Sequence, residues 1–324
     1  MRALYDQIVL LLTTPLYVII IGIELLVSHL EGVKTYSWKD TFHNFALSII
    51  TGLTDLLMRG VSLIVLTFFF RLSAITWSHS VAYWILLVLL VDMMHYWLHR
   101  LGHTCRLFWA VHVNHHTSTH FNFSVGFRTG ALEPFYSFLF FAPIALAGFR
   151  PIDIFFIYSV CQVWAILTHT GKIKKLGWLE YIFVTPSHHR VHHASNPLYL
   201  DKNMGTVFII WDKLFGTFQS ELAADNYQPI RYGITRPLEK ENLPTIIFHE
   251  WKDIVKDIRR KDINLKQKLM YLFGPPGWSH DGARMTSEQL RLKEKQDRIG
   301  GICDDFGNAK GAKETKSFSG NQVI

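Results

Sequence analysis

The chain has 324 residues, of which 49% are hydrophobic and only 18% are charged, below the roughly 25% charged residues of typical soluble domains. Residues 1–98 hold just 11 of the 59 Asp, Glu, Lys and Arg residues. The net charge of +7 is not gathered into the basic stripes with interleaved aromatics that nucleic-acid binders show. The composition therefore excludes a soluble enzyme, a disordered chain and a nucleic-acid partner as first interpretations, and predicts an integral membrane protein with a polar lobe.

Apolar runs predict an all-α membrane core with about four to five membrane helices, because about 20 apolar residues cross a bilayer as one helix. The candidate spans are residues 8–27, 57–70 and 81–98, followed by a helical hairpin of residues 131–149 and 152–168. Residues 41–56 are mixed in character and are expected to lie along the membrane interface. Asp55 and Arg59 are four residues apart, so on a helix they share a face and are expected to form an interfacial salt bridge.

The chain from residue 169 onward is too polar to cross a membrane and is expected to form the lobe. Its one apolar stretch, residues 207–218, predicts a short strand and turn or a buried piece of this lobe. Residues 281–324 carry eight basic and seven acidic residues and predict a flexible, solvated tail. The expected domains are an N-terminal membrane segment (1–56), a catalytic membrane domain (57–280) and the tail (281–324).

Lys and Arg residues are more frequent in the segments after the first, third and fifth predicted spans than in the loops between them. The positive-inside rule then places the lobe in the cytosol and the N-terminus on the other side, in a bacterial inner membrane or the endoplasmic reticulum. The chain has three cysteines and no Cys-x-x-Cys, which argues against a disulfide framework and fits a reducing compartment.

Twelve of the 17 histidines lie between His95 and His193. At the end of the third span they are spaced by four, so His95, His99 and His103 stack on one helix face, and the spacing alone allows either adjacent pair. Two His-x-x-His-His motifs follow, formed by His112, His115 and His116 and by His189, His192 and His193. All these pieces lie at the predicted cytosolic ends of spans, where they can converge.

Clustered imidazoles in this pattern predict metal binding, since imidazole suits iron, zinc and copper. A pH switch or hydrogen-bonded structural histidines would not require two copies of the doubled motif in register with the topology. Motifs for dinucleotide binding, zinc proteolysis and a serine nucleophile are absent from the sequence. His120 could belong to either class, and the remaining histidines are expected to be surface or packing residues: His29, His43, His79, His249 and His280.

The motifs resemble those of the fatty acid hydroxylase/sterol desaturase superfamily of membrane non-heme iron enzymes. The pattern begins with Asp92 and Tyr96-Trp97-Leu98-His99-Arg100-Leu101-Gly102-His103 and continues with the two His-x-x-His-His motifs. The similarity covers roughly residues 57–280. It is closest to the alkylglycerol monooxygenase-like branch, through Asn122, Ser124, Arg128, Thr185–His193, Asp201-Lys202-Asn203 and Trp211–Thr217.

The resemblance implies two iron ions and favours His99 and His103 as the first pair. The catalytic and metal-binding residues it implies are His99, His103, His112, His115, His116, His189, His192 and His193, with His169 as a ninth ligand. His95, His188, Asn122 and Asp92 are expected to support these ligands from outside. Asp92 precedes His99 by two helical turns and is expected to accept its free N–H, or alternatively to pair with another span.

The activity implied is oxygen-dependent hydroxylation of a membrane lipid, with cleavage of a glycerol ether as the first candidate. Electrons would come from an external donor, a small molecule such as tetrahydrobiopterin or a redox protein. A sterol or fatty-acyl desaturase or hydroxylase of the same superfamily is the alternative. A metal-binding membrane protein without redox turnover is the alternative from another class. The sequence does not define the oligomeric state.

Overall fold

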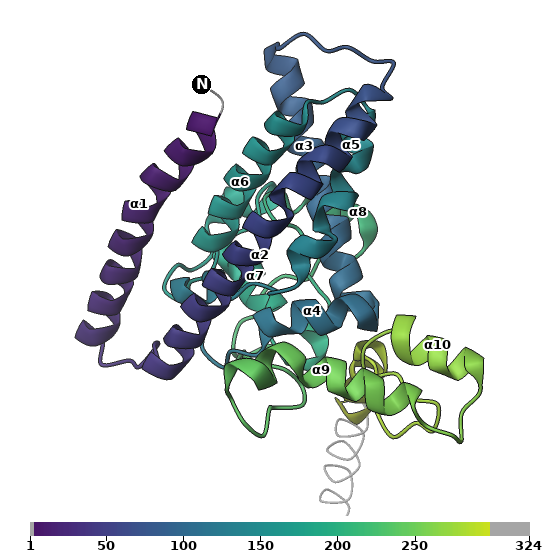
Figure 1. Ribbon diagram of the computed structural model, residues 1–324. Coiled ribbons are helices and arrows are strands. Elements are labelled where there is room, and N and C mark those ends of the chain that lie inside the picture. The colour runs from purple at the N-terminus through teal and green to yellow at the C-terminus, as the bar shows by residue number, and fades with distance from the viewer. Residues whose placement is uncertain (1–2, 299–324) are drawn as a thin grey trace, which may run out of the picture.

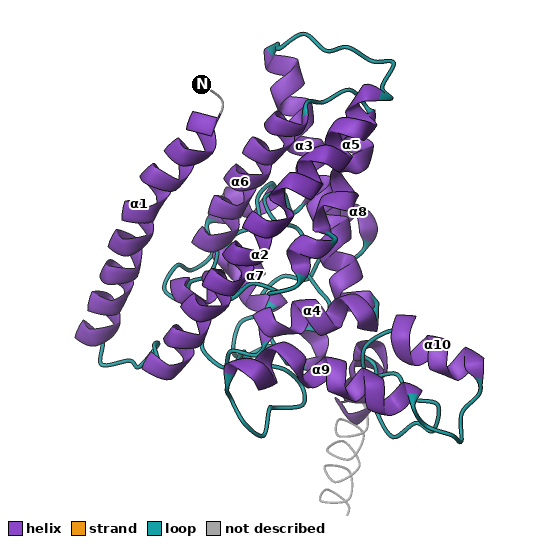
Figure 2. Ribbon diagram, in the orientation of Figure 1, coloured by secondary structure: helices purple, strands orange, loops and turns teal. Residues whose placement is uncertain are grey.

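The computed structural model describes residues 3–298, which fold into an all-helical protein (Figure 1, Figure 2). The α-helices are α1 (Ala3–Leu30), α2 (Trp38–Arg71), α3 (Val81–Thr104), α4 (Arg106–His116), α5 (Ala142–Leu146), α6 (Pro151–Leu167), α7 (Pro186–His192), α8 (Ile210–Phe215), α9 (Leu243–Ile258) and α10 (Leu265–Phe273). The 3-10 helices are η1 (Phe123–Phe127), η2 (Glu133–Phe135), η3 (Ser137–Phe141), η4 (Gly177–Tyr181) and η5 (Pro197–Tyr199). Within the described residues, β-structure is limited to two isolated bridges.

Three helices are long and apolar enough to cross a membrane: α1 over residues 13–30, α2 and α3. The outer face of α2 exposes Ile49, Leu53, Leu57 and Ile64, each more than half accessible. An apolar surface of this extent requires lipid or a protein partner. The structure therefore confirms the prediction of an all-helical membrane protein, with α9 and α10 beyond the lower ends of the long helices (Figure 1).

The second predicted span differs from the structure, because α2 runs for 34 residues without a break. The interfacial segment predicted at 41–56 and the span predicted at 57–70 are one helix, and the proposed division at residue 56 falls inside it. Polar residues in the first half of this helix suggested an interfacial segment, but they include residues that point into the protein, such as the fully buried Asn44. The predicted pair of Asp55 and Arg59 is confirmed, at 3.0 Å on the exposed surface.

The first arm of the predicted hairpin is also different. Residues 131–149 form η2, η3 and the short α5 in place of one helix, while the second arm is the regular helix α6. Pro134 and Pro143 each lie at the start of one of these pieces, where the missing N–H is tolerated. Gly148 then turns the chain with a φ of +92°, and a Cβ there would lie 2.4 Å from the carbonyl oxygen of Ile75.

The apolar core lies between α3, α5 and α6, around Leu87, Val91, Ala145, Phe149 and Ile154. These residues are essentially inaccessible. The core fixes the position of α3, and the second half of α3 carries the first histidines of the site. Packing of the membrane helices therefore determines where the site begins.

The lobe packs on α4 through a buried ionic cluster around Arg106. Its guanidinium donates to Glu250 at 2.6 Å and to Asp257 at 2.7 Å, both on α9. Arg284 donates to the same Asp257 at 2.7 Å. Truncating one member of such a buried pair is strongly destabilising, so this cluster anchors α9 beside the histidine helix α4.

The segment 281–298 was predicted to belong to a flexible tail, but the structure packs it against the lobe. Residues 287–298 are helical. Tyr227 donates to Glu294 at 2.8 Å, and Arg291 donates to the carbonyl of Leu200 at 2.7 Å. The rest of the predicted tail, residues 299–324, lies outside the described residues. The stretch 207–218 is likewise the short helix α8 after one isolated bridge, and not a strand.

Glu24 of α1 connects this outer helix to the centre of the molecule. Its carboxylate is buried and accepts hydrogen bonds from Tyr36 Oη at 2.5 Å, Phe123 N at 2.9 Å and Thr170 Oγ1 at 2.5 Å. Phe123 and Thr170 flank the site from two different loops. A residue that interrupts the apolar pattern of α1 is therefore the link between this helix and the site.

Replacing Glu24 with alanine leaves a buried backbone N–H and two hydroxyls without their acceptor. We expect Glu24→Ala to lower the free energy of unfolding by about 1–3 kcal/mol, the usual cost of stranding buried donors. Unfolding in mixed detergent, followed by circular dichroism, measures this change. Glu31→Ala is the control, because Glu31 forms only an exposed pair with Lys172 and such pairs contribute little. Equal stability of the two variants would contradict this role of Glu24.

Candidate metal centre

The structure brings all nine histidines implied as ligands into two adjacent groups. The first group is His99, His103, His112, His116 and His192, and the second is His115, His169, His189 and His193. Within each group the ring nitrogens lie within 4.8 Å of one another, which is close enough to share one metal ion. His95 and His120 belong to neither group, so of the two pairs allowed by spacing the structure places His99 and His103 together.

Each His-x-x-His-His motif divides between the two groups. On α4, His112 and His116 enter the first group while His115 enters the second. On α7, His189 and His193 enter the second group while His192 enters the first. The first and third histidines of each motif are spaced by four and share a helix face, so they enter one group, while the middle histidine turns to the other group.

Hydrogen bonds fix the orientation of the second group. His115 Nδ1 lies 2.7 Å from the carbonyl oxygen of Arg128, and His169 Nδ1 lies 2.7 Å from that of Ala165. A carbonyl only accepts, so both Nδ1 atoms carry the proton and both Nε2 atoms present a lone pair. The two Nε2 atoms are 3.3 Å apart. Two lone pairs at this distance repel unless a cation lies between them, which is the behaviour of metal ligands.

One loop orients three rings of the first group. His99 Nδ1 bonds the carbonyl of Met204 at 2.8 Å and His192 Nδ1 that of Lys202 at 2.9 Å, while His103 Nδ1 lies 3.3 Å from Asp201. The Nε2 atoms of these histidines are buried and have no hydrogen-bond partner among the described residues. Buried nitrogens of this kind normally have a partner, so their free lone pairs fit metal coordination.

Burial also favours the neutral form of several of these rings. Desolvation, and then the neighbouring imidazoles, lower the pKa of His112 and His193 well below the ordinary value. Desolvation lowers the pKa of His169 to about 4. Neutral imidazole is the form that binds a metal. The chemistry of the donor set therefore fits a first-row metal in each group.

Asp92 supports the site by a different route from the one predicted. Its carboxylate does not contact His99 but accepts from Val207 N at 2.8 Å, Phe208 N at 2.9 Å and Trp211 Nε1 at 2.9 Å. These residues continue the loop that carries Met204, the acceptor of His99. Asp92 thus fixes the position of the loop, and the loop fixes the orientation of the His99 ring through the carbonyl of Met204.

The loop has a second buried anchor in Asp212, which the sequence analysis did not single out. Asp212 accepts from Met204 N at 2.7 Å and Gly205 N at 2.8 Å. Glycine is required next to it, because a Cβ on Gly205 would lie 2.9 Å from Asp212 Oδ2 and 2.7 Å from Phe208 O. In the sequence, Asp212 is one residue of the motif Trp211–Thr217, and the motif does not indicate a role for it.

Three other predicted supporting residues do not touch the two groups. His95 stacks on Tyr158 with a centroid distance of 4.6 Å. His188 caps α7 through Thr185, and the side chain of Asn122 donates to the carbonyl of Thr35 at 2.8 Å. Their contacts maintain the helices and loops around the site.

Arg128 is a supporting residue whose role the sequence did not reveal. Its buried guanidinium donates to Asn114 O at 2.9 Å, Asn44 Oδ1 at 2.8 Å and Asp40 Oδ1 at 3.1 Å. Its own carbonyl is the acceptor of His115. Arg128 therefore fixes a histidine of the second group to polar residues at the start of α2.

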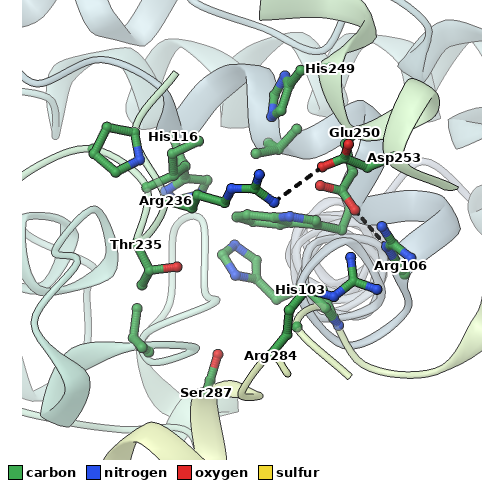
Figure 3. Close-up of a pocket in the computed structure, with 18 of the residues that line it drawn as sticks. His103, Arg106, His116, Thr235, Arg236, His249, Glu250, Asp253, Arg284 and Ser287 are labelled. Atoms are coloured by element: carbon green, nitrogen blue, oxygen red, sulfur yellow. Dashed lines mark hydrogen bonds and ion pairs between the residues drawn. The ribbon is translucent and has the colours of Figure 1, made fainter. Parts of the chain in front are cut away.

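Two cavities reach different histidines. The larger, of about 400 Å³, opens on the lobe side at His103, His116 and His192 (Figure 3). Its lining includes eight charged side chains: Arg106, Arg236, Lys252, Arg284, Asp201, Glu239, Glu250 and Asp253. The smaller, of about 160 Å³, lies among α3, α4 and α6 and reaches His99, His115 and His169. Its described lining has one charged residue besides histidines, Glu133.

Comparison with known proteins finds a matching family and several relatives of this chain. Residues 84–217 match the fatty acid hydroxylase family, and this segment of the chain belongs to that family. It is 32% identical to alkylglycerol monooxygenase of Homo sapiens over 286 residues, which are 86% of this chain and 62% of the relative. The Danio rerio alkylglycerol monooxygenase is 33% identical over 82% of this chain and 59% of its own length.

A more distant relative is the lathosterol oxidase of Mus musculus, 25% identical over 51% of this chain and 54% of that protein. No solved structure matches the chain significantly. The chain spans about three fifths of the length of the alkylglycerol monooxygenases named above.

Because Asp92 orients His99 through the loop at Met204, substitution of Asp92 is expected to lower the affinity of the site for metal. In Asp92→Asn an amide NH₂ replaces one acceptor oxygen in front of three N–H donors, so the loop and His99 should shift. We expect the affinity for divalent metal to fall by about 10–100-fold, as for other outer supports of metal ligands. Competition with a coloured chelator measures it. Asp55→Asn, on the outer surface of α2, is the control, and coincident competition curves would contradict the prediction.

Proposed function

We propose that this protein is a membrane-bound non-heme di-iron monooxygenase that hydroxylates a lipid. The observation that supports this most strongly is the pair of histidine groups with convergent, proton-free Nε2 atoms. The nine side chains exceed three ligands per metal and include no thiolate, a donor set that suits iron. Two iron ions held by these groups would supply the activation of O₂ for oxidation of an unactivated C–H bond.

The two cavities support two separate co-substrates. The larger cavity, whose lining includes eight charged side chains, suits a polar electron donor, for which a reduced pterin such as tetrahydrobiopterin is our first candidate. The smaller cavity lies beside α3, one of the three helices able to span a membrane, and suits the lipid. Donor and lipid then approach different histidines without competing for one opening.

Glycerol ethers are the lipids we propose first, because relatives with 32% and 33% identity are alkylglycerol monooxygenases. One oxygen atom would enter the C–H bond beside the ether oxygen, and the other would leave as water with two electrons and two protons from the donor. The resulting hemiacetal falls apart to a fatty aldehyde and a glycerol. The similarity to lathosterol oxidase favours sterol oxidation as the second candidate.

We further propose that the chain crosses the membrane more than once, with the lobe in the cytosol. The support is the distribution of Lys and Arg together with the position of α9 and α10 beyond one end of the long helices (Figure 1). A cytosolic lobe would open the charged cavity to the compartment in which soluble reductants are available.

Metal analysis tests whether the two groups bind separate ions. We expect His103→Ala to lose mainly the ion of the first group and His193→Ala mainly that of the second, with activity abolished in both. Inductively coupled plasma mass spectrometry of the purified variants measures the metal. His29→Ala, at an exposed position outside both groups, should retain wild-type metal and activity. Full activity in both group variants would refute the di-metal proposal.

The reaction itself is tested with a labelled 1-O-alkylglycerol, reduced pterin and O₂ in membranes containing the protein. We expect fatty aldehyde that depends on all three components and disappears in His116→Ala. A new hydroxyl group or double bond on another lipid, without aldehyde, would favour the sterol or acyl alternative. Metal binding without O₂ consumption with any lipid would favour a protein without redox turnover.

A further inference from the structure

Glu133 is a carboxylate without a partner in the smaller cavity. It belongs to η2, and among the described residues its side chain has no hydrogen bond or ion pair. Its Oε2 lies 3.4 Å from the position of a Cβ on Gly130, another lining residue, so the carboxylate reaches the cavity wall. Desolvating a carboxylate without compensation is costly, and ionisable groups near membrane spans usually have a function.

The residues around Glu133 form one polar wall of this cavity. Tyr136 and Gln162 line the same cavity. The hydroxyl of Tyr136 also has no hydrogen-bond partner among the residues described, while Gln162 donates to Tyr158 at 3.2 Å. Elsewhere the lining includes Leu98, Ala165 and Ile166, several glycines, three threonines, His95 and histidines of both metal groups. A ligand with a compact polar end can thus bind Glu133 and present its next carbons to the histidines.

We propose that Glu133 binds the uncharged, hydroxyl-bearing headgroup of the lipid substrate and excludes lipids with a phosphate headgroup. A carboxylate accepts strong hydrogen bonds from hydroxyl groups and Tyr136 can donate one in return. The described lining of this cavity contains no lysine or arginine that could neutralise a phosphate. The volume of about 160 Å³ is below the roughly 300–1,000 Å³ of ordinary ligand pockets, so only the headgroup and first carbons fit inside.

This inference rests on the proposed function, because it assigns the headgroup of the lipid that the site would oxidise. It can nevertheless be measured without turnover. Equilibrium binding of a labelled 1-O-alkylglycerol and of the same chain carrying a glycerol 3-phosphate headgroup, to the purified protein in neutral detergent, compares the two headgroups directly.

We expect the wild-type protein to bind the alkylglycerol at least tenfold more tightly than its phosphate. Glu133→Gln keeps an acceptor oxygen and the side-chain shape but removes the charge. It should reduce this preference about tenfold or more, mainly by tighter binding of the phosphate, consistent with the strength of hydrogen bonds to charged groups. In turnover assays the change should appear in KM and not in kcat. Metal content equal to that of the wild type shows that the histidine groups are intact.

Asp55→Asn is the matched control, since it makes the same chemical change on the outer surface of α2 and should leave the preference unchanged. Equal binding of both headgroups by the wild type, or an unchanged preference in Glu133→Gln, would overturn the inference. Because neither measurement uses oxygen, a protein that discriminates as expected but oxidises no lipid would refute only the monooxygenase proposal.

Discussion

The hydrogen bonds from imidazole Nδ1 atoms to backbone carbonyls are the constraint on which the site depends. Four histidines, His99, His115, His169 and His192, each meet a carbonyl oxygen at 2.7–2.9 Å. A carbonyl cannot donate, so these bonds settle the tautomer of each ring and direct its Nε2 lone pair inward. The converging lone pairs are mutually repulsive, and a bound cation would relieve this repulsion. The remaining structure can be understood as the means of holding these carbonyls in place.

The carbonyls come from segments far apart in the chain, and buried ionic groups hold two of them. The carbonyl of Arg128 is fixed because its guanidinium is bound to Asp40 and Asn44 on α2. The carbonyl of Met204 is fixed because its loop is bound by Asp92 on α3 and by Asp212. Truncating one partner of a buried ion pair such as Arg128 and Asp40 typically costs about 3–5 kcal/mol, and leaving a buried N–H group without its carboxylate acceptor costs about 1–3 kcal/mol. The membrane helices therefore support the metal centre through specific side chains as well as through packing.

The sequence predicted the helical membrane class because hydropathy is a local signal, and its histidine motifs, with the family they resemble, supplied the nine candidate ligands, including the isolated His169. It did not predict the route from Asp92 to His99, since the bonds to Val207 and Phe208 join residues more than a hundred positions apart. The same reason explains Glu24, which in sequence only interrupts an apolar run. Hydropathy also divided α2 into two segments, because the polar residues of its first half, such as Asn44, face a buried arginine that no local pattern reveals.

The division of each doubled motif between the groups has a consequence for the chemistry. On α4 and on α7, ligands of both groups project from adjacent faces of one helix turn, where Cβ atoms are separated by about 5–6 Å. Helix geometry, and not a flexible loop, then sets the spacing of the two metal positions. A displacement of either helix would move its ligands of both groups together and preserve that spacing.

The loop at Asp201–Met204 contacts only the first group, so it can adjust the ring orientations of that group without changing those of the second. The charged cavity opens beside the first group alone, whereas the smaller cavity reaches histidines of both groups. The proposed lipid would therefore lie next to ligands of both groups, whereas the proposed polar donor would approach the first group only.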